Sequence, residues 1–371
     1  MCDNNDGPNE CCKRVEPKRE RSLYCGKCKN ESGRPAVYIR NDDPPLCWSC
    51  FTERTIHKLR SVFGKSNIIK DNGKVVLGFS CGMNSFVLLD LICKINSTNK
   101  KLRFNPHVIS ISFNEEEKIK LENALNSYGV DFTIIEIDDV DFLLSSDYMK
   151  RQFIHRVLAN RVLEMNYEFL LMGDSSLRLS QLYLSGISYG KGAQLNHEVN
   201  FIDKRFSNPV VLRPLHDFLP TQIAYYFYQS IAKENRDREL IVGIPPVIPN
   251  SYESLASDFI SGLQFAGFPS SILNILKISD KVELKNFTDK MITCKVCLIE
   301  YPEEEVDDIQ ALGRRALEFS NSLIGNNEAS IIKETSKDGE ICYACTKALS
   351  DFSPDQYQIA MKYFSTGKNM I

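Results

Sequence analysis

The stretch KVVLGFSCGMNS, residues 74–85, decides the fold. Its first half, residues 74–79, is a short apolar run that predicts a buried strand. A tight Ser/Gly loop follows, and residues 86–95 then carry the apolar pattern of a helix. Such a loop, between the end of a strand and the N-terminus of a helix, turns backbone N–H groups towards a phosphate. The stretch therefore predicts an α/β protein with a candidate nucleotide-binding loop, although a plain strand-to-helix turn would use the same glycine.

The alternation of strands and helices continues through the middle of the chain. Apolar runs predict further strands at 107–113, 132–137 and 169–172, and helices at 115–128 and 148–165. Strands separated by helices of this length form βαβ units, in which the strands are parallel and helices cover both faces. We therefore predict a doubly wound parallel sheet.

Length and charge limit the possible function classes. The chain has 371 residues, enough for two or three domains. Its 45 basic and 48 acidic residues give a net charge of −3, so any basic surface for nucleic acid must be local. The most apolar run, residues 86–93, is far shorter than the roughly 20 residues of a membrane span, and the N-terminus has no secretory signal pattern. We therefore expect a cytoplasmic protein.

Eight of the 13 cysteines fall into four C-x-x-C pairs. In a reducing compartment such pairs bind metal more often than they form disulfides, because each pair supplies two thiolates from one turn. The first two pairs are 18 residues apart, which is typical of a four-cysteine zinc site, and the last two are 44 apart. We predict two structural zinc sites, with the ligands Cys25, Cys28, Cys47 and Cys50 in the first and Cys294, Cys297, Cys342 and Cys345 in the second. Buried reduced cysteines remain an alternative for the first site, and an iron–sulfur cluster or redox-active cysteines for the second.

Composition divides the chain into four parts. Residues 1–22 have little to bury and are expected to form a flexible tail. Residues 23–65 hold the first two cysteine pairs and a linking helix, and residues 66–245 form the α/β domain. After a proline-rich break, residues 246–371 form a helical region with the second four-cysteine site. Within the α/β domain, the Gly-rich residues 185–192 are predicted to be a mobile surface loop.

The loop after the first strand resembles the pyrophosphate loop of the PP-loop adenylating family, whose pattern is S-G-G-K-D-S. This chain has a degenerate version of it, made of Ser80, Cys81, Gly82, Met83, Asn84 and Ser85. The lysine of the family pattern is Met83 here, and without that cation a transferring phosphate is not neutralised. The resemblance therefore implies the PP-loop fold, while the substitutions argue against ATP use.

With the cysteine pairs near both ends and the Leu-Arg-Pro-Leu segment at 212–215, the loop makes the chain similar to the non-catalytic subunits of the tRNA wobble-uridine thiolases. The active thiolases of this family carry a Gly-His-x-x-Asp-Asp signature where this chain reads Gly-Asp-Ser-Ser-Leu-Arg at 173–178. They also keep sulfur-handling cysteines in the central domain, whereas residues 94–293 contain no cysteine. Because sulfur transfer needs a thiolate, the resemblance implies a subunit without catalytic residues.

The resemblance also implies partners. It implies a heterodimer with a catalytic PP-loop thiolase that 2-thiolates the wobble uridine of tRNAs for lysine, glutamate and glutamine, giving 5-methoxycarbonylmethyl-2-thiouridine. The sulfur would come from a thiocarboxylated ubiquitin-related modifier. Candidates for tRNA phosphate contacts are Lys191, Lys204, Arg205 and Arg213, although ordinary surface charge explains them equally well. Two other hypotheses stay open: an autonomous ATP-binding PP-loop enzyme that modifies tRNA, and a zinc-binding scaffold with no role on tRNA.

Overall fold

The computed structural model describes residues 22–29, 35–39, 43–98, 103–137, 146–191, 195–206, 208–232, 251–268, 270–282, 291–302, 341–350 and 352–365. The chain divides into two compact units, Met1–Thr55 and Ile56–Ile371. The helix α1, Trp48–Ser66, begins in the first unit and ends in the second. The predicted tail, apart from residue 22, and the proline-rich break at 243–249 lie outside the described residues.

The smaller unit is organised around its cysteine pairs. Val37 and Leu46 form an isolated antiparallel bridge, which brings the chain back towards its start. The N–H of Gly26 donates to the carbonyl of Pro45 over 2.8 Å, and this bond ties the first cysteine turn to the segment that leads into α1. The helix α1 passes through Gly64 and continues to Ser66, because a glycine weakens a helix without necessarily ending it.

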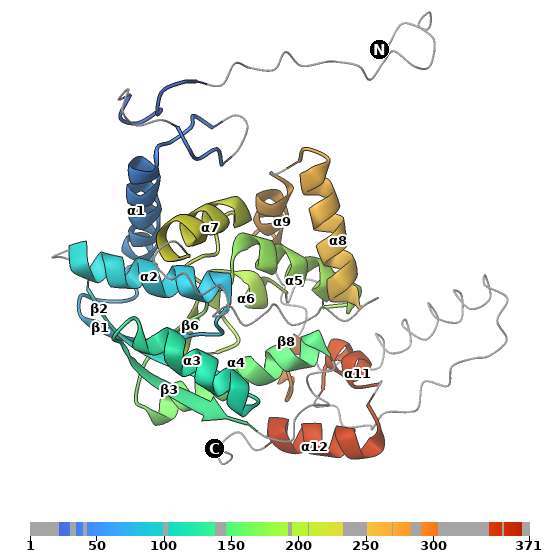
Figure 1. The fold of residues 1–371 in the computed structure, drawn as a ribbon. Coiled ribbons are helices and arrows are strands. Elements are labelled where there is room, and N and C mark those ends of the chain that lie inside the picture. The colour runs from blue at the N-terminus through green and yellow to red at the C-terminus, as the bar shows by residue number, and fades with distance from the viewer. Residues whose placement is uncertain are drawn as a thin grey trace, which may run out of the picture. The chain divides into compact units, whose positions relative to one another are not determined.

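The larger unit is built on a sheet whose described strands number six, in the order β3-β2-β1-β4-β6-β5 (Figure 1). Their bounds are β1 Gly73–Gly78, β2 Phe104–Ser112, β3 Asp131–Glu136, β4 Phe169–Leu171, β5 Ile202–Asp203 and β6 Val210–Leu212. Neighbouring strands are parallel except β5 and β6, which are antiparallel. The prediction of a doubly wound parallel sheet is confirmed, and the short edge strand β5 adds to it.

Helices cover both faces of this sheet. The helices α2, Met83–Thr98, and α3, Glu115–Asn126, connect β1 to β2 and β2 to β3, and α4, Asp147–Glu164, leads back to β4. Leu158 and Val162 of α4 pack in one cluster with Val76 of β1. Since side chains alternate along a strand, the neighbours of Val76 point to the other face, which the right-handed crossovers through α2 and α3 cover.

The segment predicted to be a mobile surface loop is not one. Residues 185–188 form the last turn of α5, Ser176–Ser188, and Tyr189 and Lys191 beyond it are buried. The glycine there serves close packing: a Cβ on Gly186 would lie only 2.1 Å from a methyl carbon of Leu195, at the start of α6. Gly186 therefore permits the close contact of α5 with α6, Leu195–Val199.

The remaining elements extend this unit. They are α7 Pro220–Tyr226, the π-helical turn η3 Phe227–Ile231, α8 Tyr252–Phe265, α9 Ser271–Ser279, the hairpin of β7 Met291–Thr293 and β8 Glu300–Pro302, α11 Tyr343–Leu349 and α12 Pro354–Ser365. The hairpin, α11 and α12 share one buried cluster with α4. These elements belong to the same compact unit as the sheet.

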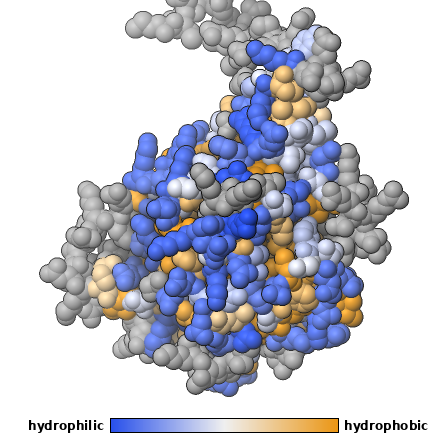
Figure 2. Space-filling view, turned by 90° about the vertical axis from the view of Figure 1, so that its left-hand side faces the viewer, coloured by the Kyte–Doolittle hydropathy of each residue, from blue (hydrophilic) through white to orange (hydrophobic). Residues whose placement is uncertain are grey.

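The surface is mixed. Figure 2 shows one face on which hydrophilic residues predominate and hydrophobic residues form smaller patches. Among the described helices, none combines the length and the hydropathy that crossing a membrane requires.

Candidate functional site

The degenerate loop, residues 80–85, lies where α/β sheets usually bind ligands. It follows the carboxyl end of β1, and residues 173–175 follow the carboxyl end of the neighbouring strand β4. Because the chain continues to β2 on one side of β1 and reaches β4 on the other, this is the topological switch point of the sheet. The two segments touch: the side-chain amide of Asn84 donates to the hydroxyl of Ser175 over 3.2 Å.

The loop turns with a backbone that glycine would favour, although its side chains differ from the family pattern. Cys81, which replaces a family glycine, has φ of 53°, in the left-handed region where glycine is favoured. Ser85 holds the turn, because its hydroxyl donates to the carbonyl of Gly82 over 2.8 Å. Burial raises the pKa of the Cys81 thiol to about 12. Cys81 is therefore protonated at neutral pH and is no nucleophile in this state.

The altered signature after β4 places Asp174 at the centre of a buried charge cluster. Arg151 of α4 donates to both carboxylate oxygens of Asp174, each over 3.1 Å, and Arg213 donates to one of them over 3.2 Å. Burial alone would raise the pKa of Asp174, but the charges of Arg151 and Arg213 outweigh it and hold this pKa well below its usual range. Asp174 is therefore an ion-pair partner at neutral pH.

Further ion pairs extend this cluster into a chain. Arg213 also pairs with Asp203 of β5, and Asp203 pairs with Arg205 over 2.7 Å. Arg205 pairs with Glu198 of α6 over 2.8 Å, and Glu198 pairs with Lys191. The resulting ion-pair chain runs through Arg151, Asp174, Arg213, Asp203, Arg205, Glu198 and Lys191, with alternating charge.

The ion-pair chain corrects the prediction of tRNA contacts at three positions. The side chains of Lys191, Arg205 and Arg213 are at most 1% exposed and are paired with carboxylates. A guanidinium or ammonium that is buried and paired cannot reach an RNA phosphate. Lys204 is exposed, and its contact with tRNA stays a prediction.

The first four cysteines come together in the smaller unit. The sulfur atoms of Cys25, Cys28, Cys47 and Cys50 lie within 4.8 Å of one another. Three of these side chains are buried and Cys28 is exposed. Burial raises the pKa of Cys25, but backbone N–H groups, those of Cys28 and Cys47 first, outweigh it and lower this pKa to about 6. The group therefore favours at least one thiolate before any metal binds.

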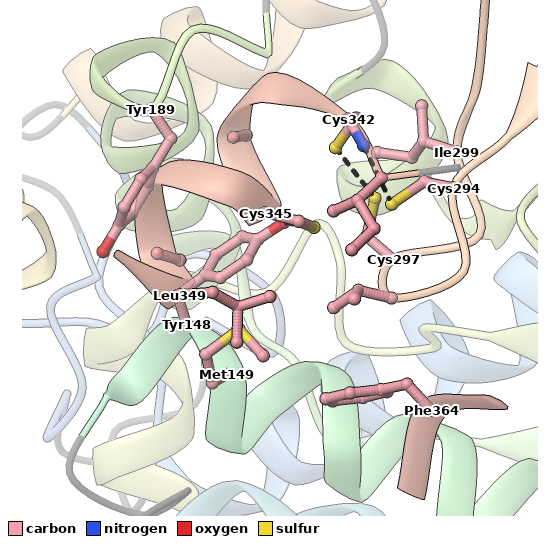
Figure 3. Close-up of a cluster of buried hydrophobic side chains, with 14 of the residues drawn as sticks. Tyr148, Met149, Tyr189, Cys294, Cys297, Ile299, Cys342, Cys345, Leu349 and Phe364 are labelled. Atoms are coloured by element: carbon pink, nitrogen blue, oxygen red, sulfur yellow. Dashed lines mark hydrogen bonds between the residues drawn. The ribbon is translucent and has the colours of Figure 1, made fainter. Parts of the chain in front are cut away.

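The second four cysteines come together in the larger unit, and all of them are buried. Cys294 and Cys297 flank a tight turn between β7 and β8, and Cys342 and Cys345 lie at the start of α11 (Figure 3). The backbone N–H of Cys342 donates to the sulfur of Cys294 over 3.4 Å. The hydroxyl of Tyr148, from α4, lies 3.2 Å from the sulfur of Cys345. Residues far apart in sequence therefore build this group.

Both groups fit a tetrahedral metal ion. Four sulfurs at the Zn–S distance of about 2.3 Å lie about 3.8 Å from one another at the corners of a tetrahedron. The sulfur–sulfur distance is 3.9 Å between Cys28 and Cys47 and 3.6 Å between Cys297 and Cys342. None of the described cysteines forms a disulfide. Each predicted set of four ligands is thus assembled as one candidate metal centre.

Several residues around these sites escaped the sequence analysis. Tyr148 and the acidic members of the ion-pair chain carry no motif, apart from Asp174, which lies in the altered signature. Their elements are distant in sequence: Tyr148 and Cys345 are 197 residues apart. In the sequence, the signal that pointed to this region was its lack of cysteine between residues 94 and 293.

The sheet order, the loop at its switch point and the two cysteine groups define a PP-loop α/β protein with two candidate metal centres. Residues 251–347 match the family model of cytoplasmic tRNA 2-thiolation protein 2. The chain is 27% identical to cytoplasmic tRNA 2-thiolation protein 2 of Aedes aegypti over 312 residues, which cover 73% of this chain and 67% of the relative. It is 25% identical to that of Drosophila melanogaster over 367 residues, covering 86% and 89%.

A solved structure supports the fold. The U34-tRNA thiolase NcsA from Methanococcus maripaludis, solved with its 4Fe-4S cluster, aligns with a TM-score of 0.55 and 19% identity. The alignment covers 74% of this chain and 96% of the thiolase. The predicted resemblance to the PP-loop thiolases is therefore confirmed at the level of the fold.

Proposed function

We propose that this chain is the non-catalytic subunit of a heterodimeric cytoplasmic tRNA thiolation complex. Its partner is a catalytic PP-loop thiolase, and the pair is required to 2-thiolate the wobble uridine of tRNAs for lysine, glutamate and glutamine. The sulfur comes from a thiocarboxylated ubiquitin-related modifier. One observation carries the proposal: at the switch point, ion pairs occupy the position where a thiolase needs free catalytic groups.

The chemistry of the loop supports the non-catalytic role. ATP activation needs a cation beside the transferring phosphate, and Met83 offers none at the position of the family lysine. Sulfur transfer needs a thiolate, but burial raises the pKa of Cys81 to about 12 and, with the charge of Asp90, that of Cys93 to about 11. Both thiols are therefore poor sulfur carriers at neutral pH.

We further propose that both four-cysteine sites hold zinc in a structural role. Four thiolates saturate a tetrahedral ion and leave no open position for substrate. Because an iron–sulfur cluster also takes four thiolates, elemental analysis of the purified protein decides between the two metals. Two zinc ions per chain and no iron or inorganic sulfide are expected.

Mass spectrometry of tRNA nucleosides from cells lacking this protein tests the main proposal. The 2-thiolated wobble uridine is expected to disappear and to return with the wild-type gene. A Met83→Lys/Asn84→Asp variant, which restores two residues of the family loop, should rescue no better than wild type, since the partner performs the chemistry. Thiolation of tRNA by the purified chain alone, with ATP and a sulfur donor, would refute the non-catalytic role. Unchanged nucleosides in the deletion strain would favour a scaffold with no role on tRNA.

The autonomous-enzyme hypothesis retains one supporting observation, since the loop turns at Cys81 in the left-handed region that suits the glycine of the family pattern. ATP titration by calorimetry separates the two hypotheses. A Cβ on Gly82 would meet only the flexible hydroxyl of Ser80, at 3.3 Å, so Gly82→Ala perturbs the loop without disturbing the fold. We expect no tight ATP binding in either protein; tight binding that Gly82→Ala abolishes would favour the autonomous enzyme.

A further inference from the structure

The ion-pair chain carries an excess of positive charge inside the protein. Four of its members are basic and three are acidic, and the side chains are at most 11% exposed. The neighbouring His155 does not add charge, because burial, followed by the charge of Arg151, lowers its pKa well below the ordinary value. Although each basic member is paired with a carboxylate, the ion-pair chain therefore carries a net charge of +1.

Arg156 of α4, which is half-buried, adds a further positive charge. Its guanidinium donates to the backbone carbonyls of Lys295 over 2.6 Å and Val296 over 3.3 Å, inside the turn between Cys294 and Cys297. It also donates to the carbonyl of Phe364 in α12 over 2.5 Å. No carboxylate among the described residues forms an ion pair with it. Arg156 is thus a cation held against the C-terminal cysteine group by backbone carbonyls and by the ring of Phe364, 5.5 Å from its centroid.

The end of the ion-pair chain meets the same cysteine group from another side. The ammonium of Lys191 lies 4.5 Å from the ring centroid of Tyr148, and the hydroxyl of that ring lies 3.2 Å from the sulfur of Cys345. Figure 3 shows this hydroxyl directed at Cys345. Burial would lower the pKa of Lys191, but negative charge, first from Glu198 and then from Cys297, outweighs it and raises this pKa. Lys191 therefore stays charged beside the cysteines.

A positive excess inside the protein is stabilised by a negative counterpart. A net charge taken out of water costs several kcal/mol even after relaxation, unless an opposite charge lies close to it. Four thiolates around a divalent ion carry a total charge of −2. The positive excess of the ion-pair chain together with Arg156 equals this charge, and Lys191 and Arg156 lie on two sides of the site that would carry it.

We propose that the ion-pair chain and Arg156 are the built-in counter-charge of the C-terminal metal centre, and that Lys191 and Tyr148 are the residues that position and stabilise its thiolates. The inference rests on the proposed metal occupancy of this centre and is independent of the role on tRNA. It assigns Lys191, Arg205 and Arg213 to metal binding, although sequence suggested RNA contacts for them. If the ion-pair chain only stabilised the fold, removing a positive charge and removing a negative charge would affect metal binding equally.

Substitutions that break one ion pair from its two sides test this preference. Lys191→Met removes a positive charge and should weaken divalent metal binding, whereas Glu198→Gln removes a negative charge and should not. The probe is Co²⁺, followed by its thiolate charge-transfer absorption, in the full chain with Cys25→Ser/Cys28→Ser so that only the C-terminal centre reports. We expect Lys191→Met to weaken the affinity about tenfold or more and Glu198→Gln to bind at least as tightly as the parent. Lys204→Met, at an exposed position, is the matched control.

A milder variant guards against misfolding. Tyr148→Phe keeps the ring under Lys191 and removes only the hydroxyl beside Cys345, so it should weaken Co²⁺ binding less than Lys191→Met and shift the charge-transfer band. Circular dichroism verifies the fold of each variant. Equal losses of affinity in Lys191→Met and Glu198→Gln, or no change in Lys191→Met and Tyr148→Phe, would overturn the inference. A parent that binds no Co²⁺ would overturn the metal assignment itself, while leaving the role on tRNA open to its own test.

Discussion

The two four-cysteine groups have the same ligands and C-x-x-C turns but different surroundings. In the N-terminal group Cys28 is exposed, and the nearby ion pair of Lys27 and Glu53 is on the surface. In the C-terminal group all four cysteines are buried in one cluster with α4, β7, β8, α11 and α12. Of its charged neighbours, Lys191 is buried and Arg156 is half-buried. A pattern of cysteines thus predicts the ligands of a metal centre, while the surrounding charge and packing determine how far its loss propagates.

The largest expected difference concerns loss of a ligand. Cys345→Ser leaves an incomplete site in the core of the larger unit and should lower its free energy of unfolding by more than about 4 kcal/mol. Cys28→Ser should disturb only the smaller unit. Thermal unfolding followed by near-UV circular dichroism, with metal content measured in parallel, checks the difference. A similar decrease of the main transition in both variants would contradict the comparison.

The next expected effect concerns the ion-pair chain. Asp203→Asn leaves Arg205 and Arg213 without their shared carboxylate and should cost about 3 to 5 kcal/mol in urea unfolding. Asp217→Asn, at the exposed ion pair with His216, is the control and should cost less than about 1 kcal/mol. Equal decreases in the free energy of unfolding for the two substitutions would show that burial does not strengthen the contribution of these ion pairs.

The same carboxylates predict an acid dependence. Burial would raise the pKa of Asp203, but the charges of Arg205 and Arg213 hold it well below its usual range. A depressed native pKa stabilises the fold above the unfolded value of about 4, and this contribution is lost as the pH falls below that value. The free energy of unfolding of the wild type, measured with urea, should therefore decrease between pH 5 and pH 3. The decrease should be shallower in Asp203→Asn. An equal slope in both proteins would contradict the assignment.

A kinetic difference between the two centres is also expected. Because Cys28 is exposed and the C-terminal cysteines are buried, a chelator should remove metal from the N-terminal centre first. Variants that each retain one centre allow the two release rates to be measured with a chromogenic chelator. Faster release from the C-terminal centre would show that burial does not protect it.

The smallest effect is expected at the surface ion pair of the smaller unit. The side chains of Lys27 and Glu53 are 53% and 64% exposed, so water and salt screen their attraction. Lys27→Met should therefore leave thermal unfolding and metal content unchanged, in contrast to Lys191→Met. A clear loss of metal in Lys27→Met would show that surface charge also supports the N-terminal centre.

The sequence predicted the features that depend on local patterns. The apolar run before residue 80 gave the strand β1 and the switch-point loop, and the spacing of the cysteines gave both ligand sets. The ion-pair chain was not predictable, because its members come from separate elements and look like ordinary surface charges in the sequence. Gly186 misled for a related reason: glycine permits both a mobile loop and a tight helix contact, and only the position of Leu195 decides between them.

The contacts of α4 also bear on how the chain folds during synthesis. Tyr148 meets Cys345 after 197 residues, and Arg156 meets Phe364 after 208. At a translation rate of about 5 to 20 residues per second, α11 and α12, which cover the apolar face of α4, are synthesised roughly 10 to 40 s after α4. During that interval this face is open to chaperones and to aggregation. Nascent chains stalled before residue 341 should therefore bind chaperones more strongly than the completed chain.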